Sequence, residues 1–333
     1  MADFPRLQLA VGLAVVLALV LWHSDEPMDE LLAVVLALCL TYQLARVLPY
    51  TPLWPRQVAD AKGLLGAPRL RILIANVLME NRDAAPLLAL IKEHAPDVVL
   101  LVETDGWWAE RLLAVESRYS HVLRRPQGNH YGLHFMSKIP VEDIEVRRLV
   151  SEDVPSVRAR LMLAPGREVE FHGLHPRPPV PGQDSDERDA EILIVAREVR
   201  ERGMPAIVAG DLNDVAWSHT TRLFQRISGL LDPRRGRGTF STFPVDYPML
   251  RWPLDHVFHD ASFRLVRLVR LPSIGSDHFP MMIDLAQEAS AEADQPAPQP
   301  DRADIEEAEE MIRQGLKVAG GERQMPEIKR PTY

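Results

Sequence analysis

Two long apolar runs open the chain, and neither has a polar stripe at helical spacing. Residues 7–22 and 31–44 contain no charged side chain. A helix that is apolar on every side suits lipid or a deep protein core. We therefore predict a membrane anchor over residues 1–48, with transmembrane helices at about 7–23 and 31–48. A soluble helical hairpin is the alternative.

The pattern changes after the apolar runs. Residues 49–68 are rich in proline and are predicted to be a linker. From 69 to 285, short β-branched runs alternate with helical segments, which favours an α/β domain of two packed β-sheets flanked by helices. The strand candidates are 71–77, 97–103, 132–138, 157–164, 168–175, 206–213, 255–259, 263–271 and 279–285, and the helix candidates are 83–94, 185–202 and 217–227.

The last segment, residues 286–333, is rich in alanine, proline and acidic residues. Such a composition buries little apolar surface, so we expect an acidic and largely disordered tail with one helix at about 302–317. The whole chain carries a formal charge of −9. This argues against a protein that holds nucleic acid on a basic surface, although bound metal ions could supply positive charge. The lone Cys39 excludes an internal disulfide.

Polar side chains follow several of the predicted strands. Asn76, Glu103 and His175 each come at the end of an apolar run, and Asp211 and Asn213 follow another. Each alone is an ordinary turn residue. Because strand ends present side chains to a crevice, their joint occurrence predicts a chemical site there.

The motifs around these residues resemble the endonuclease/exonuclease/phosphatase superfamily, which includes DNase I. They arrive in family order: Asn76, LVE ending at Glu103, YGLHFMSKIP, HGLHP around His175, GDLND at 210–214, LDH at 254–256 and SDH at 276–278. The resemblance covers about 70 to 285 and implies a catalytic domain over 69–285. It also implies a four-layer α/β sandwich of two packed mixed β-sheets flanked by helices, here preceded by transmembrane helices.

The resemblance also implies metal-dependent chemistry. It assigns the metal site to Glu103 and Asp277, which match metal-side carboxylates of the family, and to Asn76 beside them. Hard cations prefer such oxygen ligands, so Mg²⁺ is the expected cofactor and Mn²⁺ a possible one. Asp211 matches the residue that orients or deprotonates the attacking water, and Asn213 the amide donor to the phosphate.

Three further residues complete the implied site. His278 matches the histidine beside the scissile phosphate, Asp255 the carboxylate that holds it, and His175 a hydrogen-bond donor to the phosphate or leaving group. The Asp–His pair could also belong to a serine hydrolase, but no Gly-x-Ser-x-Gly elbow accompanies it. Four other histidines have no zinc-site spacing and are left out of the predicted site: His130, His134, His256 and His259.

Within the superfamily the chain resembles a bacterial membrane-anchored branch that includes teicoplanin-resistance-associated proteins. The matching residues are LPYTPLWP at 48–55 and Asn76, Val77 and Asn81. The branch implies a multi-pass protein of the bacterial cytoplasmic membrane. Its members often have three helices and an extracytoplasmic catalytic domain, and the start MADFPRLQ resembles an internal loop, which suggests a helix before Met1. By the positive-inside rule, the basic residues that flank the two runs place both termini in the cytoplasm instead. The side of the membrane on which the catalytic domain lies therefore stays open.

The favoured function is hydrolysis of a phosphoester or pyrophosphate by a membrane-anchored, metal-dependent phosphoesterase. Its expected partners are the lipid bilayer and a phosphate-ester substrate, either lipid-linked or close to the membrane. One alternative is an Mg-dependent endonuclease or exonuclease, for which DNA or RNA is a substrate only. Another is a catalytically inactive membrane protein that uses the fold for binding.

Overall fold

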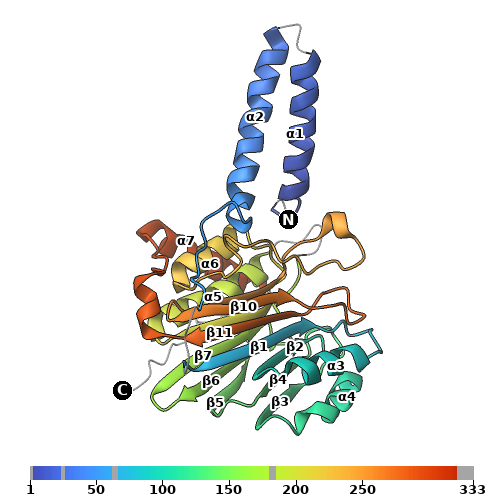
Figure 1. Ribbon diagram of the computed structural model, residues 1–333, viewed down its shortest axis with the longest axis vertical. Coiled ribbons are helices and arrows are strands. Elements are labelled where there is room, and N and C mark those ends of the chain that lie inside the picture. The colour runs from blue at the N-terminus through green and yellow to red at the C-terminus, as the bar shows by residue number, and fades with distance from the viewer. Residues whose placement is uncertain (1–2, 24–26, 62–66, 180–184, 321–333) are drawn as a thin grey trace.

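An apolar helical hairpin projects from a globular body in the computed structural model, which describes residues 3–23, 27–61, 67–179 and 185–320 (Figure 1). The hairpin consists of α1 (Arg6–His23) and α2 (Pro27–Val47). Both helices are long and apolar enough to cross a membrane, and only 11% of each apolar window is buried. Their bounds lie close to those predicted from the sequence.

One β-sheet of the body has six strands in the order β10-β11-β1-β2-β4-β3. β1 and β2 run parallel, and the other neighbours run antiparallel. Two helices cover its outer face, where Leu87 and Trp108 pack against sheet residues such as Leu73. These elements are β1 (Arg69–Asn76), α3 (Ala85–His94), β2 (Val98–Val102), α4 (Gly106–Glu116), β3 (His121–Arg125), β4 (Leu133–Ser137), β10 (Phe263–Arg270) and β11 (Met281–Gln287).

The second sheet has five strands in the order β5-β6-β7-β8-β9. Here β7 and β8 are the parallel pair. Three helices cover its outer face. The elements are β5 (Val141–Arg147), β6 (Ser156–Ala164), β7 (Arg167–Leu174), α5 (Asp186–Arg202), β8 (Ala206–Asp211), α6 (His219–Ser228), β9 (Asp255–His259) and α7 (Arg302–Val318), with short 3-10 turns η1 (Leu48–Tyr50), η2 (Pro248–Leu250) and η3 (Ala289–Ala293).

The main hydrophobic core lies between the two sheets. Ile72 of β1 and Ile207 of β8 are fully buried in it, and the rings of Phe135 and Phe171 pack with their centroids 5.4 Å apart. Helices on both outer faces make this a four-layer sandwich (Figure 1). The fold class predicted from the sequence is therefore confirmed.

The proline-rich segment after the hairpin packs against the body over its described part, residues 49–61. Tyr50 and Val58 are buried. The backbone NH of Ala61 donates to the carbonyl of Leu265 at 2.8 Å, so this end of the segment follows β10. The segment thus connects hairpin and body through contacts along its length. The rest of the predicted linker includes residues 62–66, which lie outside the described residues.

The tail corrects an expectation. Residues 288–320 are not disordered: after η3, helix α7 begins at a capping box formed by Asp301 and Asp304 and packs on α5. Ala308, Ile312 and Leu316 are spaced four apart, so they form one buried stripe along the helix. The helix itself was predicted at about 302–317, but its packing against the body was not, because the composition of the tail is acidic and poor in aromatic residues. Residues 321–333 lie outside the described part.

Candidate active site

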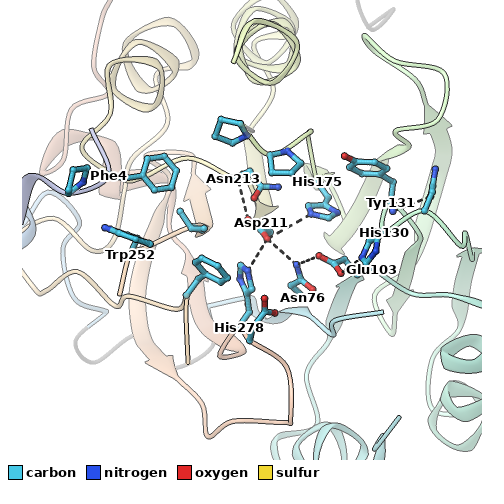
Figure 2. Close-up of a pocket in the computed structure, with 17 residues that line it drawn as sticks. Phe4, Asn76, Glu103, His130, Tyr131, His175, Asp211, Asn213, Trp252 and His278 are labelled. Carbon is cyan, nitrogen blue, oxygen red and sulfur yellow. Dashed lines mark hydrogen bonds and ion pairs between the residues drawn. The ribbon is translucent and has the colours of Figure 1, made fainter. Parts of the chain in front are cut away.

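Side chains from both sheets meet in one pocket of about 660 Å³ (Figure 2). Asn76 ends β1, Glu103 follows β2, His175 follows β7, and Asp211 ends β8. Each sheet contributes one parallel pair, and the carboxyl ends of parallel strands point to the same edge of a sheet. Seven of the eight predicted site residues line this pocket: Asn76, Glu103, His175, Asp211, Asn213, Asp277 and His278. The eighth, Asp255, is fully buried behind His278.

Asn76 connects the carboxylates of the two sheets. Its amide nitrogen donates to Glu103 Oε1 at 2.7 Å and to Asp211 Oδ2 at 3.1 Å. Its Oδ1 accepts from the backbone NH of Leu78 at 3.0 Å, which fixes the orientation of the amide. In this arrangement Asn76 positions Glu103 and Asp211 through its nitrogen.

The turn after β8 holds Asp211 at the pocket floor. Gly210 has φ +140°, and a Cβ there would lie 2.0 Å from the carbonyl oxygen of Leu174, so the motif needs glycine. Asp211 Oδ1 accepts from the backbone NH of Asn213 at 2.9 Å. The Asn213 amide donates to the carbonyl of Pro176 at 2.9 Å and retains a second hydrogen.

His278 lies between two buried carboxylates. Its Nδ1 is 2.8 Å from Asp255 Oδ2, and its Nε2 is 3.5 Å from Asp211 Oδ2. Burial opposes the charged ring, but the charges of Asp211 and Asp255 outweigh burial and raise the pKa of His278 to about 10. The histidine is therefore a cation at neutral pH.

His175 and Asp277 are the remaining polar side chains beside Asp211. His175 Nε2 lies 3.8 Å from Asp211 Oδ2, and its buried Nδ1 has no hydrogen-bond partner among the described residues. Burial, with the nearby charges of Glu103 and Asp211, raises the pKa of Asp277. Asp277 therefore lies close enough to Glu103 and Asp211 to feel their negative charge, which the charge of His278 opposes.

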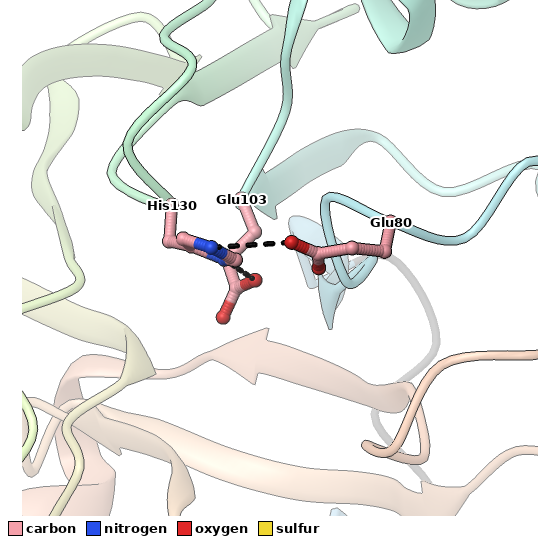
Figure 3. Close-up of side chains that lie close together, drawn as sticks. All are labelled: Glu80, Glu103 and His130. Atoms are coloured by element: carbon pink, nitrogen blue, oxygen red, sulfur yellow. Dashed lines mark hydrogen bonds and ion pairs between the residues drawn. The ribbon is translucent and has the colours of Figure 1, made fainter.

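His130 and Tyr131 also line the pocket, and neither was among the predicted site residues. His130, which was left out for lack of zinc spacing, lies with Nδ1 3.1 Å from Glu103 Oε2 and Nε2 3.2 Å from Glu80 Oε1 (Figure 3). Tyr131 has its ring centroid 5.6 Å from that of His175. Gly132 lets this loop approach closely, because a Cβ there would lie 1.7 Å from the carbonyl oxygen of Thr104. The YGLHFMSKIP motif marked this loop in the sequence, but it did not show which side chains the loop would contact.

The other excluded histidines have structural partners. His134 is buried 3.0 Å from Glu116, and His259 Nδ1 contacts the carbonyl of Asp260 at 2.9 Å. Arg234 donates to His256 Nδ1 at 2.6 Å. These three rings lie outside the pocket.

The oxygen donors at the pocket fit a hard divalent cation. Glu103 and Asp277 are carboxylates, whereas the described residues bring no cysteine to this site. Two groups have the ligand spacing for a metal ion: Glu80, Glu103 and His130, and separately Asp211, Asp255 and His278. The second group is internally neutralised by the His278 cation, so Glu103 and its neighbours are the better ligands.

Away from the carboxylates the pocket is apolar. Its wall includes Phe4 and Pro5, which precede α1, together with Phe243, Trp252 and Leu254. Figure 2 shows Phe4 and Trp252 on one side of the pocket and the polar cluster on the other. None of these apolar residues was predicted, because no motif relates the start of the chain to residues 243–254.

This sandwich, with its polar cluster at the strand ends, defines a DNase I-like α/β protein. The sequence model of the endonuclease/exonuclease/phosphatase family matches residues 73–278, and the chain belongs to that family. Its members are phosphoester hydrolases, which confirms the predicted class of enzyme, a hydrolase that acts on phosphoester bonds. No curated protein matches the chain.

Solved structures with the same fold include proteins from animals and bacteria. D. rerio TDP2, in complex with single-strand DNA product, has a TM-score of 0.56 and 16% identity, covering 66% of this chain and 99% of that one. The human Nocturnin catalytic domain with bound sulfate has a TM-score of 0.53 and 15% identity, covering 66% and 95%. A family protein from Bacteroides thetaiotaomicron has a TM-score of 0.54 and 17% identity, covering 67% and 100%.

Proposed function

We propose that this protein is a membrane-anchored, metal-dependent phosphoesterase that hydrolyses a phosphoester or pyrophosphate in a lipid-linked or membrane-proximal substrate. One observation carries the proposal: the polar cluster and an apolar wall share one pocket, and that wall begins at the foot of the hairpin. The hairpin helices expose leucine and valine on all sides, unlike a core helix of a soluble protein. We assign them to the bilayer, as a multi-pass anchor in the cytoplasmic membrane, in keeping with the teicoplanin-resistance-associated branch.

Glu103 and Asp277 would hold Mg²⁺ or Mn²⁺, with Asn76 positioning the Glu103 carboxylate. When bound, such an ion neutralises charge on the phosphoryl oxygens. The carboxylate of Asp211, at the pocket floor between His175 and His278, orients the attacking water and accepts its proton. The protonated ring of His278 lies beside this carboxylate, with Nε2 3.5 Å from Asp211 Oδ2.

His278 and His175 supply the remaining polar contacts to the substrate. The His278 cation, held by Asp255, donates to a phosphoryl oxygen as negative charge grows there. His175 donates to the phosphate or the leaving group, and the second hydrogen of the Asn213 amide is available to the same phosphate. Together these groups would contact a phosphoester from the strand ends of both sheets.

The test uses the full chain in phospholipid nanodiscs with Mg²⁺. Product release is measured from a polyisoprenyl pyrophosphate, a bis-nitrophenyl phosphodiester and plasmid DNA, with Glu103→Gln and the exposed Glu142→Gln as controls. We expect hydrolysis of the lipid substrate by the wild type and Glu142→Gln, and loss with Glu103→Gln. Cleavage of DNA alone would favour the nuclease alternative, and no metal-dependent cleavage of any substrate would favour a binding protein.

A further inference from the structure

A line of aromatic rings runs from the catalytic histidine to the first residues of the anchor. The rings of His278 and Phe243 have centroids 4.7 Å apart, Phe243 and Trp252 stack at 6.4 Å, and Phe4 meets Trp252 edge-on at 5.6 Å. Phe4 lies two residues before α1. The wall is therefore continuous from the phosphoryl site to the hairpin.

The anchor segment is fixed in this place by polar contacts. The indole nitrogen of Trp217 donates to the carbonyl oxygen of Asp3 at 2.7 Å, and Arg6 pairs with the Asp3 carboxylate. Arg6 also donates to Gln43 of α2 at 2.8 Å, which connects both hairpin helices to the same point. Phe4 is thus held as part of the pocket.

The rim beside this wall is apolar and exposed. The loop around η2 presents Tyr247, Met249 and Leu250 to solvent, and 85% of Met249 is exposed. Gln8 of α1 donates to the carbonyl of Met249 at 3.1 Å, so the loop lies against the hairpin. Figure 1 shows η2 near the foot of α1. Exposed apolar groups beside a membrane helix suit the bilayer interface.

We propose that Phe4, Phe243 and Trp252 form a subsite for the apolar chain of the substrate, so that the membrane anchor itself supplies one wall of the active site. This inference rests on the proposed function. The occupant is the hydrocarbon chain of an amphiphilic phosphoester, because the wall begins at the reacting phosphate and ends where a bilayer would begin. The chain would remain among apolar side chains while its phosphate reaches Asp211 and His278.

A series of alkyl 4-nitrophenyl phosphates tests the subsite. In each, water attacks phosphorus, the bond from phosphorus to the aryl oxygen breaks, and nitrophenolate and the alkyl phosphate leave. We compare methyl, butyl and octyl esters with the full chain in nanodiscs. For the wild type, kcat/KM should rise by at least about tenfold from methyl to octyl, because added methylenes move from water to the apolar wall.

Two variants locate the effect. Phe4→Ala and Trp252→Ala should lose most of the gain with chain length, mainly through KM, so that the ratio of kcat/KM between the octyl and methyl esters falls towards one. Trp54→Ala is the matched control: Trp54 is an exposed tryptophan near the hairpin and lies outside this pocket. Trp54→Ala should keep the full rise in kcat/KM from the methyl to the octyl ester.

The outcomes separate the two proposals. A methyl ester cleaved by the wild type without any gain for octyl would overturn the subsite and leave the phosphoesterase intact. If Phe4→Ala and Trp252→Ala keep the full gain, the gain comes from partitioning of the octyl ester into the bilayer and the subsite is overturned. An equal loss in Trp54→Ala would show that the loss is not specific to this wall and would also overturn the subsite. If no ester is cleaved even with Mg²⁺ or Mn²⁺, the proposed function itself fails.

Discussion

The buried pair of Asp255 and His278 shows how single residues set the chemistry of this pocket. His278 is 4% exposed and Asp255 is fully buried, so the interaction between them is little weakened by water. The protonated ring then faces Asp211 with its other nitrogen, 3.5 Å away. A positive group is thereby kept beside the place where a phosphate would react.

Replacing Asp255 by asparagine should lower kcat by about 10²–10⁴-fold, since the amide cannot stabilise the His278 cation. The pKa of His278 should also fall from its raised value of about 10. Activity that needs the protonated ring is lost as pH rises through this pKa, so the alkaline limb of the kcat–pH profile should move to lower pH. Asp143→Asn, at an exposed aspartate on β5, is the control. An unmoved alkaline limb would contradict this role.

Metal binding should be visible without turnover. A cation that binds only the folded protein stabilises it, by about 2.7 kcal/mol at a concentration of 100 times Kd. We expect Mg²⁺ to raise the Tm of the wild type, and Glu103→Gln or Asp277→Asn to remove the shift. Glu80→Gln should retain it. Loss of the shift in Glu80→Gln would instead place the ion among Glu80, Glu103 and His130 (Figure 3).

His256 should make the fold sensitive to acid. Its Nε2–H donates to the carbonyl of Asp214, and Arg234 donates to Nδ1. Burial, and after it the Arg234 charge, lowers the pKa of His256 to about 3. Below pH ~6.5 the unfolded chain gains a proton that the folded chain does not, which costs up to about 1.4 kcal/mol per pH unit.

Denaturant unfolding at pH values of about 7.5, 6.5 and 5.5 checks this linkage, because these values lie on both sides of the ordinary histidine pKa. The free energy of unfolding should decline below pH ~6.5, and His256→Gln should reduce the slope even if it is less stable at neutral pH. Equal slopes in both proteins would assign the acid sensitivity to other groups, such as His134 and His259, whose pKa values burial also lowers.

How well a site residue could be predicted depended on whether it lies in a local motif. Asp211 and His278 stand in short segments with a recognisable order, so the sequence was enough to bring them together. Phe4 and Trp252 meet only because the segment before α1 packs against the body at the base of the hairpin. His130 reaches Glu103 only because Gly132 admits a close backbone approach. Such contacts depend on tertiary packing that no spacing along the chain records.

At the scale of elements, the strands buried on both faces were the most predictable. β2 and β8 are buried at every residue and read as unbroken apolar runs. β3 and β5 were not predicted. Each is an edge strand of its sheet, and their sequences HVLRR and VEDIEVR carry polar or charged residues at most positions. Edge strands need few apolar side chains, so periodicity is weak there.

Helix α7 offers a test of packing between elements. A Cβ on Gly315 would lie 2.3 Å from the carbonyl oxygen of Asp186 and 2.4 Å from Ala190 Cβ, both on α5. Alanine normally stabilises an exposed helix interior over glycine by about 1 kcal/mol. Here Gly315→Ala should instead destabilise by about 1–3 kcal/mol, because the two helices must separate.

The comparison variant for this test is Gly106→Ala. Gly106 begins α4, and a Cβ there would meet nothing within 4 Å. It should be neutral or slightly stabilising in thermal unfolding of the full chain. If Gly315→Ala is as stable as Gly106→Ala, then α7 does not pack on α5 as the structure has it, and the tail is closer to the disordered one expected from composition.

At the scale of the whole molecule, the hairpin is attached through a packed interface. Tyr50 donates to the carbonyl of Ala216 at 2.5 Å, and its ring meets that of Trp217 with centroids 6.1 Å apart. The backbone NH of Gly236 donates to the carbonyl of Pro49 at 2.8 Å. Val47, at the end of α2, is buried in the same cluster. These contacts hold the pocket at a set angle to the anchor.

The lone Cys39 allows this attachment to be measured. It is exposed on α2, and Leu113→Cys, at an exposed position on α4, permits spin labels on the hairpin and on the body. If the interface is rigid, double electron–electron resonance in nanodiscs should give one narrow distance distribution. Tyr50→Ala removes the hydrogen bond and ring contact, so the distribution should broaden. A broad wild-type distribution that Tyr50→Ala leaves unchanged would mean that the hairpin is only tethered, and Phe4 could not then serve as a fixed wall of the pocket.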